Sequence, residues 1–133
     1  MSSGTGSLLG SVVNDPTMTL IERGLDLASV RHAALSNNIA NVNTPGYKRR
    51  DVPFEDVMRE VASGGYEGTS GAAGLERVVT VNTGRTNRND GNNVDIDYEM
   101  TVLAQNSVLY NALARQISQK ISLLRTVITE GRR

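Results

Sequence analysis

The 133-residue chain contains no cysteine and no tryptophan, and it has one phenylalanine and one histidine. Without cysteine it can form no disulfide, no thiol nucleophile and no cysteine-ligated zinc site. His32 has no second histidine to join it in a metal or catalytic centre, so we interpret it as a histidine in or at the edge of a helix seam, satisfied by a neighbour. The composition argues against an enzyme, and we expect no catalytic residue, no metal and no cofactor.

The formal net charge is zero, whereas nucleic-acid-binding domains carry a basic excess or stripe. The only basic run, Lys48–Arg50, is short, and we interpret it as a solvated loop. Neither Lys48 nor Lys120, the only lysines, follows a glycine at the spacing of a phosphate-binding loop. We therefore expect no nucleic-acid partner and no small-molecule substrate.

No apolar run approaches the roughly 20 residues of a membrane-spanning helix. No lysine or arginine precedes Arg23, so the positive region of a secretory signal is missing. We expect export, if it occurs, to need no cleaved signal. Residues 1–15 begin rich in glycine and serine and predict a flexible N-terminal segment.

Residues 16–42 predict a long helix with apolar residues at alternating spacings of four and three, which is the pattern of a coiled-coil seam. Asp15 and Pro16 suit its first turn, and a capping box from Thr19 to Glu22 is an alternative start. The predicted seam residues are Ile21, Leu25, Ala28, His32, Leu35, Ile39 and Val42.

Residues 94–131 predict a second long helix, because no glycine or proline interrupts the chain from Val94 to Glu130. Its predicted seam is Ile96, Met100, Leu103, Ser107, Tyr110, Ala114, Ile117, Ile121, Leu124 and Ile128. A second apolar stripe lies beside it: Val102, Leu109, Leu113, Leu123 and Val127. This apolar face is wider than one helix partner covers, so we expect the surplus to pack on other molecules.

The start of this helix resembles a calcium-binding loop, but the spacing fails. With Asp90 as position 1, position 6 is Asp95 instead of glycine and position 12 is Thr101 instead of glutamate. We interpret the acidic residues as a helix cap that places negative charge beside the free N–H groups of the first turn: Asp95, Asp97 and Glu99.

Residues 43–93 predict a turn motif, a short helix and a loose connector. Pro45-Gly46 suits a type II turn. Phe54, Val57, Met58 and Val61 share one face of a helix too short to be stable alone, which must therefore dock on something. Residues 75–81 look strand-like. The expected fold is a single all-α domain, in which the two long terminal helices pair as an antiparallel coiled coil and a long irregular segment with at most a short strand or hairpin joins them.

Two stretches resemble known signatures. Residues 34–48 resemble the "NNIANVNTPGYK" signature of bacterial flagellar rod and hook proteins, and residues 90–100 resemble the "DGNNVD-D-E" signature of the proximal-rod subset. Together they identify a flagellar basal-body rod protein of the proximal, B-type or C-type, kind. The resemblance covers both helical ends, and residues 63–89 carry no signature.

The resemblance implies a structural subunit of the proximal rod, the helical drive shaft that transmits torque to hook and filament. It implies export by the flagellar type III apparatus without a cleaved signal peptide and assembly in the rod that crosses the periplasm. The implied partners are copies of itself, other rod proteins, and the membrane-ring protein with its rod adapter. A soluble coiled-coil export adapter or chaperone stays open as the alternative.

Three sets of candidate residues follow. For assembly and packing we assign Leu35, Ile39, Val42, Ile117, Ile121, Leu124 and Ile128. The turn motif comprises Asn38, Asn41, Asn43, Thr44, Pro45, Gly46 and Tyr47. Phe54 and Met58 match a Phe-x-x-x-hydrophobic pattern by which, as the resemblance implies, export-gate proteins recognise rod and hook subunits.

Overall fold

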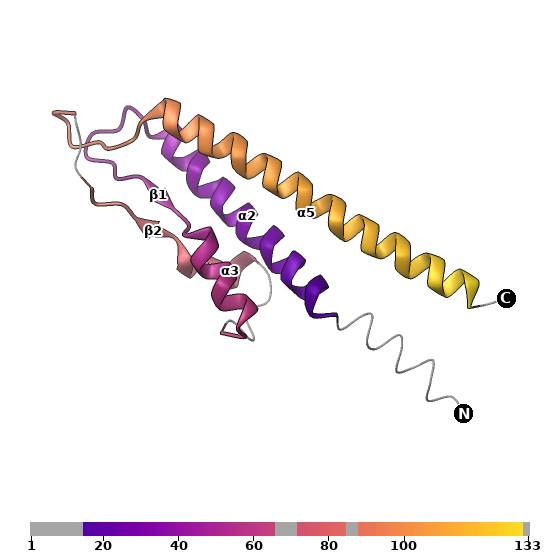
Figure 1. Cartoon of the computed structure of the whole chain (residues 1–133). Helices are drawn as coiled ribbons and strands as arrows, with labels where there is room; N and C mark the ends of the chain where they lie inside the picture. Colours follow the sequence, from indigo (N-terminus) through magenta and orange to yellow (C-terminus); the bar gives the residue numbers. More distant parts are fainter. Residues whose placement is uncertain (1–14, 66–71, 85–87, 132–133) are drawn as a thin grey trace.

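The computed structural model describes residues 15–65, 72–84 and 88–131, so the predicted flexible segment lies outside the described residues except for Asp15. Two long helices, α2 (Pro16–Ala40) and α5 (Ile96–Glu130), run antiparallel to each other (Figure 1). Between them the chain forms β1 (Arg50–Asp51), α3 (Phe54–Ala62), α4 (Ala72–Leu75), the 3-10 helix η1 (Glu76–Val78) and β2 (Thr80–Val81). The predicted all-α fold with paired terminal helices is confirmed.

Both long helices start at an aspartate cap. The Asp15 carboxylate accepts a hydrogen bond from Thr17 N–H at 3.0 Å, so the chain uses the Asp15–Pro16 start and not the alternative capping box. The Asp95 carboxylate accepts from Asp97 N–H at 3.0 Å at the start of α5. These caps satisfy backbone donors that have no partner within the helix.

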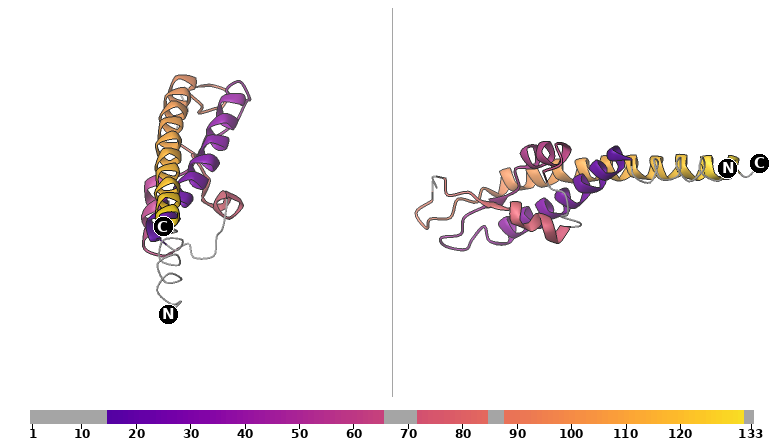
Figure 2. Two further views of the ribbon diagram at one scale, coloured as in Figure 1. Left: turned by 90° about the vertical axis from the view of Figure 1, so that its right-hand side faces the viewer. Right: turned by 90° about the horizontal axis from the view of Figure 1, so that it is seen from below.

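Three contacts fix the register of α2 against α5. Asn38 Nδ2 donates to the Glu99 carboxylate at 3.1 Å, Asn106 Nδ2 donates to Ala28 O at 2.9 Å, and Lys120 Nζ lies 2.6 Å from Asp15 Oδ2. The last contact is at the first residue before α2, yet α5 continues to Glu130. Figure 2 shows this end of α5 extending past the start of α2, by roughly 15 Å at 1.5 Å per residue.

The face that α5 presents to α2 is rotated from the predicted seam. Met100 and Tyr110, assigned to that seam, are 52% and 43% exposed, whereas Val102 and Asn106 are buried. On α2 the predicted seam residue His32 is exposed. The prediction was wrong here because polar residues occupy buried positions between the helices, and a pattern of apolar residues alone passes over them.

Gly24 lets the helices approach closely in the middle of their contact. A Cβ atom at this position would lie 3.1 Å from Leu113 Cδ1 and 3.6 Å from Met58 Cε. Leu113 belongs to the second apolar stripe, so that stripe contributes to the helix contact. Glycine therefore serves packing at this helix-interior site, where its intrinsic propensity is unfavourable.

The apolar core lies between α2 and the connector. Leu27 and Val30 of α2 pack there with four buried residues of the connector: Val52, Val57, Leu75 and Val78. Phe54, Met58, Val61 and Val79 pack against this cluster, so the short helix α3 docks as predicted. In Figure 1, β1, β2 and α3 lie along the side of α2 opposite α5. The predicted loose connector thus holds several short elements folded over α2.

The predicted strand at residues 75–81 is wrong over most of its length. Leu75 ends α4, η1 follows, and only Thr80 and Val81 pair, antiparallel, with β1. The reason is that Leu75 and Val78 both reach the core. A helical turn places residues three apart on one side, whereas a strand would point them to opposite faces.

Candidate functional site

The two stretches that flank the connector, residues 37–51 and 88–99, meet at one end of the helix pair; we call this region the junction. Gly46 N–H donates to Asp90 O at 2.8 Å, and Asn93 N–H donates to Tyr47 O at 3.3 Å. Arg49 N–H donates to Asn93 Oδ1 at 2.7 Å. The turn motif and the chain that enters α5 are therefore one hydrogen-bonded unit.

Asn92 caps the chain as it leaves α2. Its buried amide nitrogen donates to the carbonyl oxygens of Asn41, Val42 and Thr44 at 2.8–3.1 Å. Its Oδ1 accepts from Val94 N–H at 2.7 Å. The carbonyls at the end of a helix lack partners within it, so a side chain from the second signature stretch satisfies the end of the first helix.

Asn38 joins α2 to the chain at β1. Its Oδ1 accepts from Arg50 N–H at 2.8 Å and from the Tyr47 hydroxyl at 3.2 Å, while its Nδ2 donates to Arg50 O at 2.6 Å. The same nitrogen donates to Glu99 Oε2. Because one fully buried amide binds both backbone groups of Arg50, this segment is held against the last turns of the helix.

A chain of alternating charges crosses the junction. Glu99 is fully buried, and its Oε1 lies 2.6 Å from Arg49 Nε. Arg49 Nη2 lies 3.3 Å from Asp51 Oδ2, and Asp51 Oδ1 lies 2.8 Å from Arg31 Nε. The Arg49 guanidinium also lies 5.0 Å from the centre of the Tyr98 ring. Two arginines and two carboxylates therefore balance in a region largely closed to solvent.

The surroundings favour the charged forms of Asp51 and Arg49. Burial acts to raise the pKa of Asp51, but hydrogen bonds from Arg31 and from Val52 N–H outweigh it and hold that pKa below its ordinary value. Burial acts to lower the pKa of Arg49, but Glu99 and Asp51 outweigh it and raise that pKa. Both partners of the Arg49–Asp51 ion pair are therefore favoured in their charged forms.

The other residues of the predicted turn motif lie at the tip of the junction. Gly46 has a φ of +74°, which suits glycine, and a Cβ added at this position would meet no atom within 4 Å. Asn41 Nδ2 donates to Asn37 O at 2.7 Å, and Asn41 Oδ1 accepts from the Thr44 hydroxyl at 3.0 Å. Asn43 and Pro45 are exposed. The motif therefore has an inner part that bonds to the fold and an outer part open to contacts.

The candidate packing residues divide between two places. Leu35 is buried, and Ile39 and Val42 are half-buried near the junction. On α5, Ile117 and Leu124 are half-buried, whereas Ile121 and Ile128 are exposed. Leu123 and Val127 of the second stripe lie beside the two exposed isoleucines and are 65% and 58% exposed. We call these four residues the distal α5 surface: Ile121, Leu123, Val127 and Ile128.

The three acids assigned as a helix cap have different places. Asp95 caps α5, and Asp97 is exposed in the first turn. Glu99 also lies in the first turn, but its carboxylate faces inward to Arg49 and Asn38. Sequence reasoning missed the roles of Arg31, Arg49 and Asn92. The available signal was Glu99, because a glutamate on the inner side of a helix needs a cation as its partner.

Within the described ranges, no three histidine, aspartate or glutamate side chains gather as metal ligands would. No helix in the same part of the chain combines the length and the apolar character needed to cross a membrane.

Comparison with known proteins gives consistent relatives. The model of the flagella basal body rod protein family matches residues 21–48, which form most of α2 and the turn. The flagellar basal body rod protein FlgB of Bacillus subtilis (strain 168) is 34% identical over 123 residues, covering 87% of this chain and 95% of that protein. FlgB of Escherichia coli (strain K12) is 30% identical over 132 residues, covering 88% and 96%.

Proposed function

The chain belongs to the FlgB flagellar basal body rod proteins, and from this premise we propose that it is a structural subunit of the proximal rod. In this role it assembles through its terminal helices into the shaft that transmits torque to hook and filament. The observation that carries the proposal is the apolar surface that α5 leaves uncovered.

That surface runs along most of α5. Met100, Val108, Leu123 and Val127 are 52–70% exposed, and they are spread along α5. Burying one such side chain completely contributes about 1.5–3 kcal/mol. Contacts between unlike faces of neighbouring copies do not close in pairs and can build a helical tube, so this surface suits a subunit of a shaft.

The finer details of location and partners are also part of the proposal. The neighbours are copies of the chain and other rod proteins, with the membrane-ring protein and its rod adapter at the base. The flagellar type III apparatus exports the chain without a cleaved signal peptide, and the rod crosses the periplasm. Family membership supports these details.

Recognition for export through Phe54 and Met58 would precede folding. In the folded chain both side chains pack against the core between α2 and α3, so a receptor could not enclose them there. The unfolded segment would present both residues. No specific observation favours the alternative of a soluble adapter or chaperone, and the proposed role involves no catalysis.

The test is Leu123→Asp in a strain whose own copy of the gene is deleted. This side chain is exposed, so the charge should leave the subunit folded and secreted but should abolish rod assembly and swimming. Ser122→Asp places the same charge on the neighbouring exposed residue and should preserve both rod assembly and swimming. Leu124→Asp, at the half-buried neighbour, should also abolish assembly while secretion stays measurable.

Purified basal bodies, the secreted fraction and soft-agar swimming provide the three measurements. Wild-type assembly in the Leu123→Asp variant would exclude the distal α5 surface as an assembly surface. Absence of the wild-type chain from purified basal bodies would refute the rod function itself.

A further inference from the structure

An apolar groove runs along the end of α5 beside the start of α2; we call it the distal groove. Its volume is about 400 Å³, and its apolar lining comes from Met18 of α2 and from Leu123, Leu124 and Val127 of α5. Leu123 and Val127 are 65% and 58% exposed. They are four residues apart and therefore lie on one side of the helix, so one element lying along α5 could cover both.

The chain itself reaches the edge of the distal groove. Asp15 and Lys120 also line it, and Lys120 Nζ lies 2.6 Å from Asp15 Oδ2. Fourteen residues precede Asp15 in the sequence, and they join the described chain at this edge. From Lys120 to Glu130, α5 continues for roughly 15 Å at 1.5 Å per residue without α2 beside it.

The residues before Asp15 have the chemistry of an occupant. Residues 1–14 contain no aspartate, glutamate, lysine or arginine, so they bring no charged side chain to an apolar groove. Their branched apolar residues form two pairs with a spacing of four: Leu8 with Val12, and Leu9 with Val13. In a helix the two pairs share one face. A helix this short is not stable alone and needs a surface to pack on.

The register of the long helices brings one of these pairs to the groove. Between the contact of Asn38 with Glu99 and that of Asp15 with Lys120, α2 and α5 advance by almost the same number of residues. If this antiparallel register continues, each residue before Asp15 lies level with one residue after Lys120. The levels then match for two pairs of side chains: Val12 with Leu123, and Leu8 with Val127.

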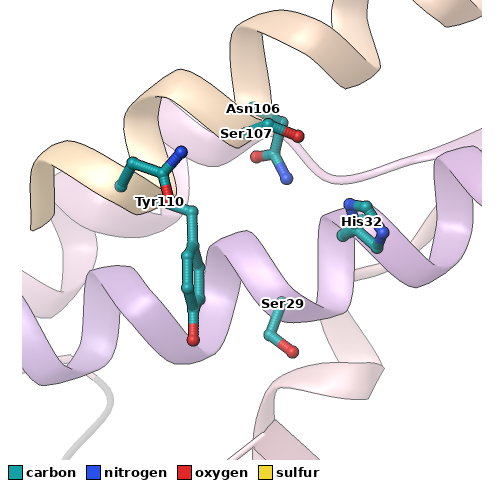
Figure 3. Close-up of a pocket in the computed structure, with 6 residues that line it drawn as sticks. Ser29, His32, Asn106, Ser107 and Tyr110 are labelled. Carbon is teal, nitrogen blue, oxygen red and sulfur yellow. The ribbon is translucent and has the colours of Figure 1, made fainter. Parts of the chain in front are cut away.

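The polar cavity between α2 and α5 is not a second place for this segment. It lies nearer the junction, and Figure 3 shows five of the side chains that line it: Ser29, His32, Asn106, Ser107 and Tyr110. Hydroxyl, amide and imidazole groups need hydrogen bonds, which the side chains of leucine and valine cannot supply. The apolar lining of the distal groove makes no such demand.

We propose that residues 8–13 pack in the distal groove of their own chain, with Leu8 and Val12 covering Val127 and Leu123. The tether at Asp15 holds the segment beside the groove at an effective concentration in the millimolar range. The segment of a second copy has no such advantage in the free chain. Docking would order a stretch that the sequence predicts to be flexible.

The inference goes beyond the rod function and concerns the chain before assembly. Ile121 and Ile128 are seven residues apart and lie together on the other side of α5 from Leu123 and Val127. They therefore stay available to neighbouring copies. The docked segment would form part of the assembly surface at this end of the molecule.

Disulfide formation in the purified chain, which has no native cysteine, tests the contact. The variant Leu8→Cys/Val127→Cys places two thiols at one level of the register. The control Leu8→Cys/Thr126→Cys moves the second thiol to the preceding residue, which is exposed and does not line the groove. With the same oxidant, the first variant should close its intramolecular disulfide about tenfold faster, the ratio that corresponds to 1.4 kcal/mol.

Two results of this experiment would overturn the proposal. Equal closing rates in the two variants would mean that the segment does not occupy the groove. Disulfide-linked dimers in place of closed monomers would assign the groove to the segment of a second copy.

A charge on the apolar face of the segment provides the second arm. Val12→Asp should lower the closing rate of Leu8→Cys/Val127→Cys to that of the Thr126→Cys control. Circular dichroism of the long helices should not change, because position 12 precedes α2. Asn14→Asp is the matched control: helical spacing places the same charge opposite the apolar face, so fast closure should persist.

If Val12→Asp closed as fast as Asn14→Asp, the apolar pairs would not hold the segment and the inference would fail. The rod function would survive that result, because incorporation into basal bodies is scored separately from closure in the free chain.

Discussion

The substitution Glu99→Gln measures what the charged network at the junction contributes to folding. The carboxylate lies 2.6 Å from Arg49 Nε and also accepts from Asn38, and it is fully buried. Glutamine keeps the shape but removes the charge. Deleting one partner of a buried ion pair costs about 3–5 kcal/mol, because the other charge stays desolvated. Arg49 keeps Asp51 at 3.3 Å, so we expect the lower end, about 3 kcal/mol.

The assay is urea unfolding of the purified chain at pH 7, followed by circular dichroism at 222 nm. Asp56→Asn is the matched control, because it removes one charge from an ion pair with Arg59 at 3.1 Å whose side chains are 74% and 76% exposed. Exposed pairs of this kind contribute roughly 0.5 kcal/mol or less. We therefore expect the two variants to differ in stability because one ion pair is buried and the other is exposed, and not because of the distance between the charges.

The double variant Arg49→Leu/Glu99→Leu completes the test. Replacing both partners of a buried pair removes the unpaired charge, so part of the lost stability should return. If Glu99→Gln cost no more than Asp56→Asn, the reasoning would be refuted, and the network would have to be open to water in solution.

Three further predictions concern the same region. Neighbouring groups lower the pKa of Asp51 in the folded chain. Its contribution to the free energy of unfolding is therefore complete above the unfolded-state pKa of about 4 and is lost as the pH falls through the folded-state pKa. Asp51→Asn should therefore flatten the fall in melting temperature on the acid side. Gly46→Val should cost about 1–2 kcal/mol through its positive φ alone and impair swimming, whereas Gly64→Val, with φ +86° outside the junction, should cost similar stability and preserve swimming. Asn92→Ala should cost about 2 kcal/mol by removing the donor to three carbonyls, with faster amide exchange measured at residues 94–98; equal exchange would contradict its capping role.

The long helices could be predicted because their signals are local. Pro16 follows a capping aspartate, and no glycine or proline interrupts the chain from Val94 to Glu130. The side that each helix buries could not be predicted from apolar spacing. Asn38, Glu99 and Asn106 are buried between the helices, and they are stable there only because of partners supplied from elsewhere.

The junction depends on pairs that are far apart in the sequence. Arg49 and Glu99 are separated by fifty positions, and Asn92 bonds to carbonyls about fifty positions before it. No periodicity in a single sequence connects such residues. The connector was hard to predict for a different reason: its strands have two residues each, which is too short for an alternating pattern to appear.

The two ends of the molecule have different energetic roles. At the junction, buried amides and charges meet partners in fixed directions, so this end sets the geometry of the helix pair and has little to gain from a neighbour. Along α5, apolar side chains such as Leu123 and Val108 remain exposed, and apolar burial favours contact without fixing direction. Substitutions at the junction should therefore lower the stability of the free chain first. Substitutions on α5 should lower assembly while the free chain stays folded, and this separation is what a subunit needs if it must fold alone and then bear load among neighbours.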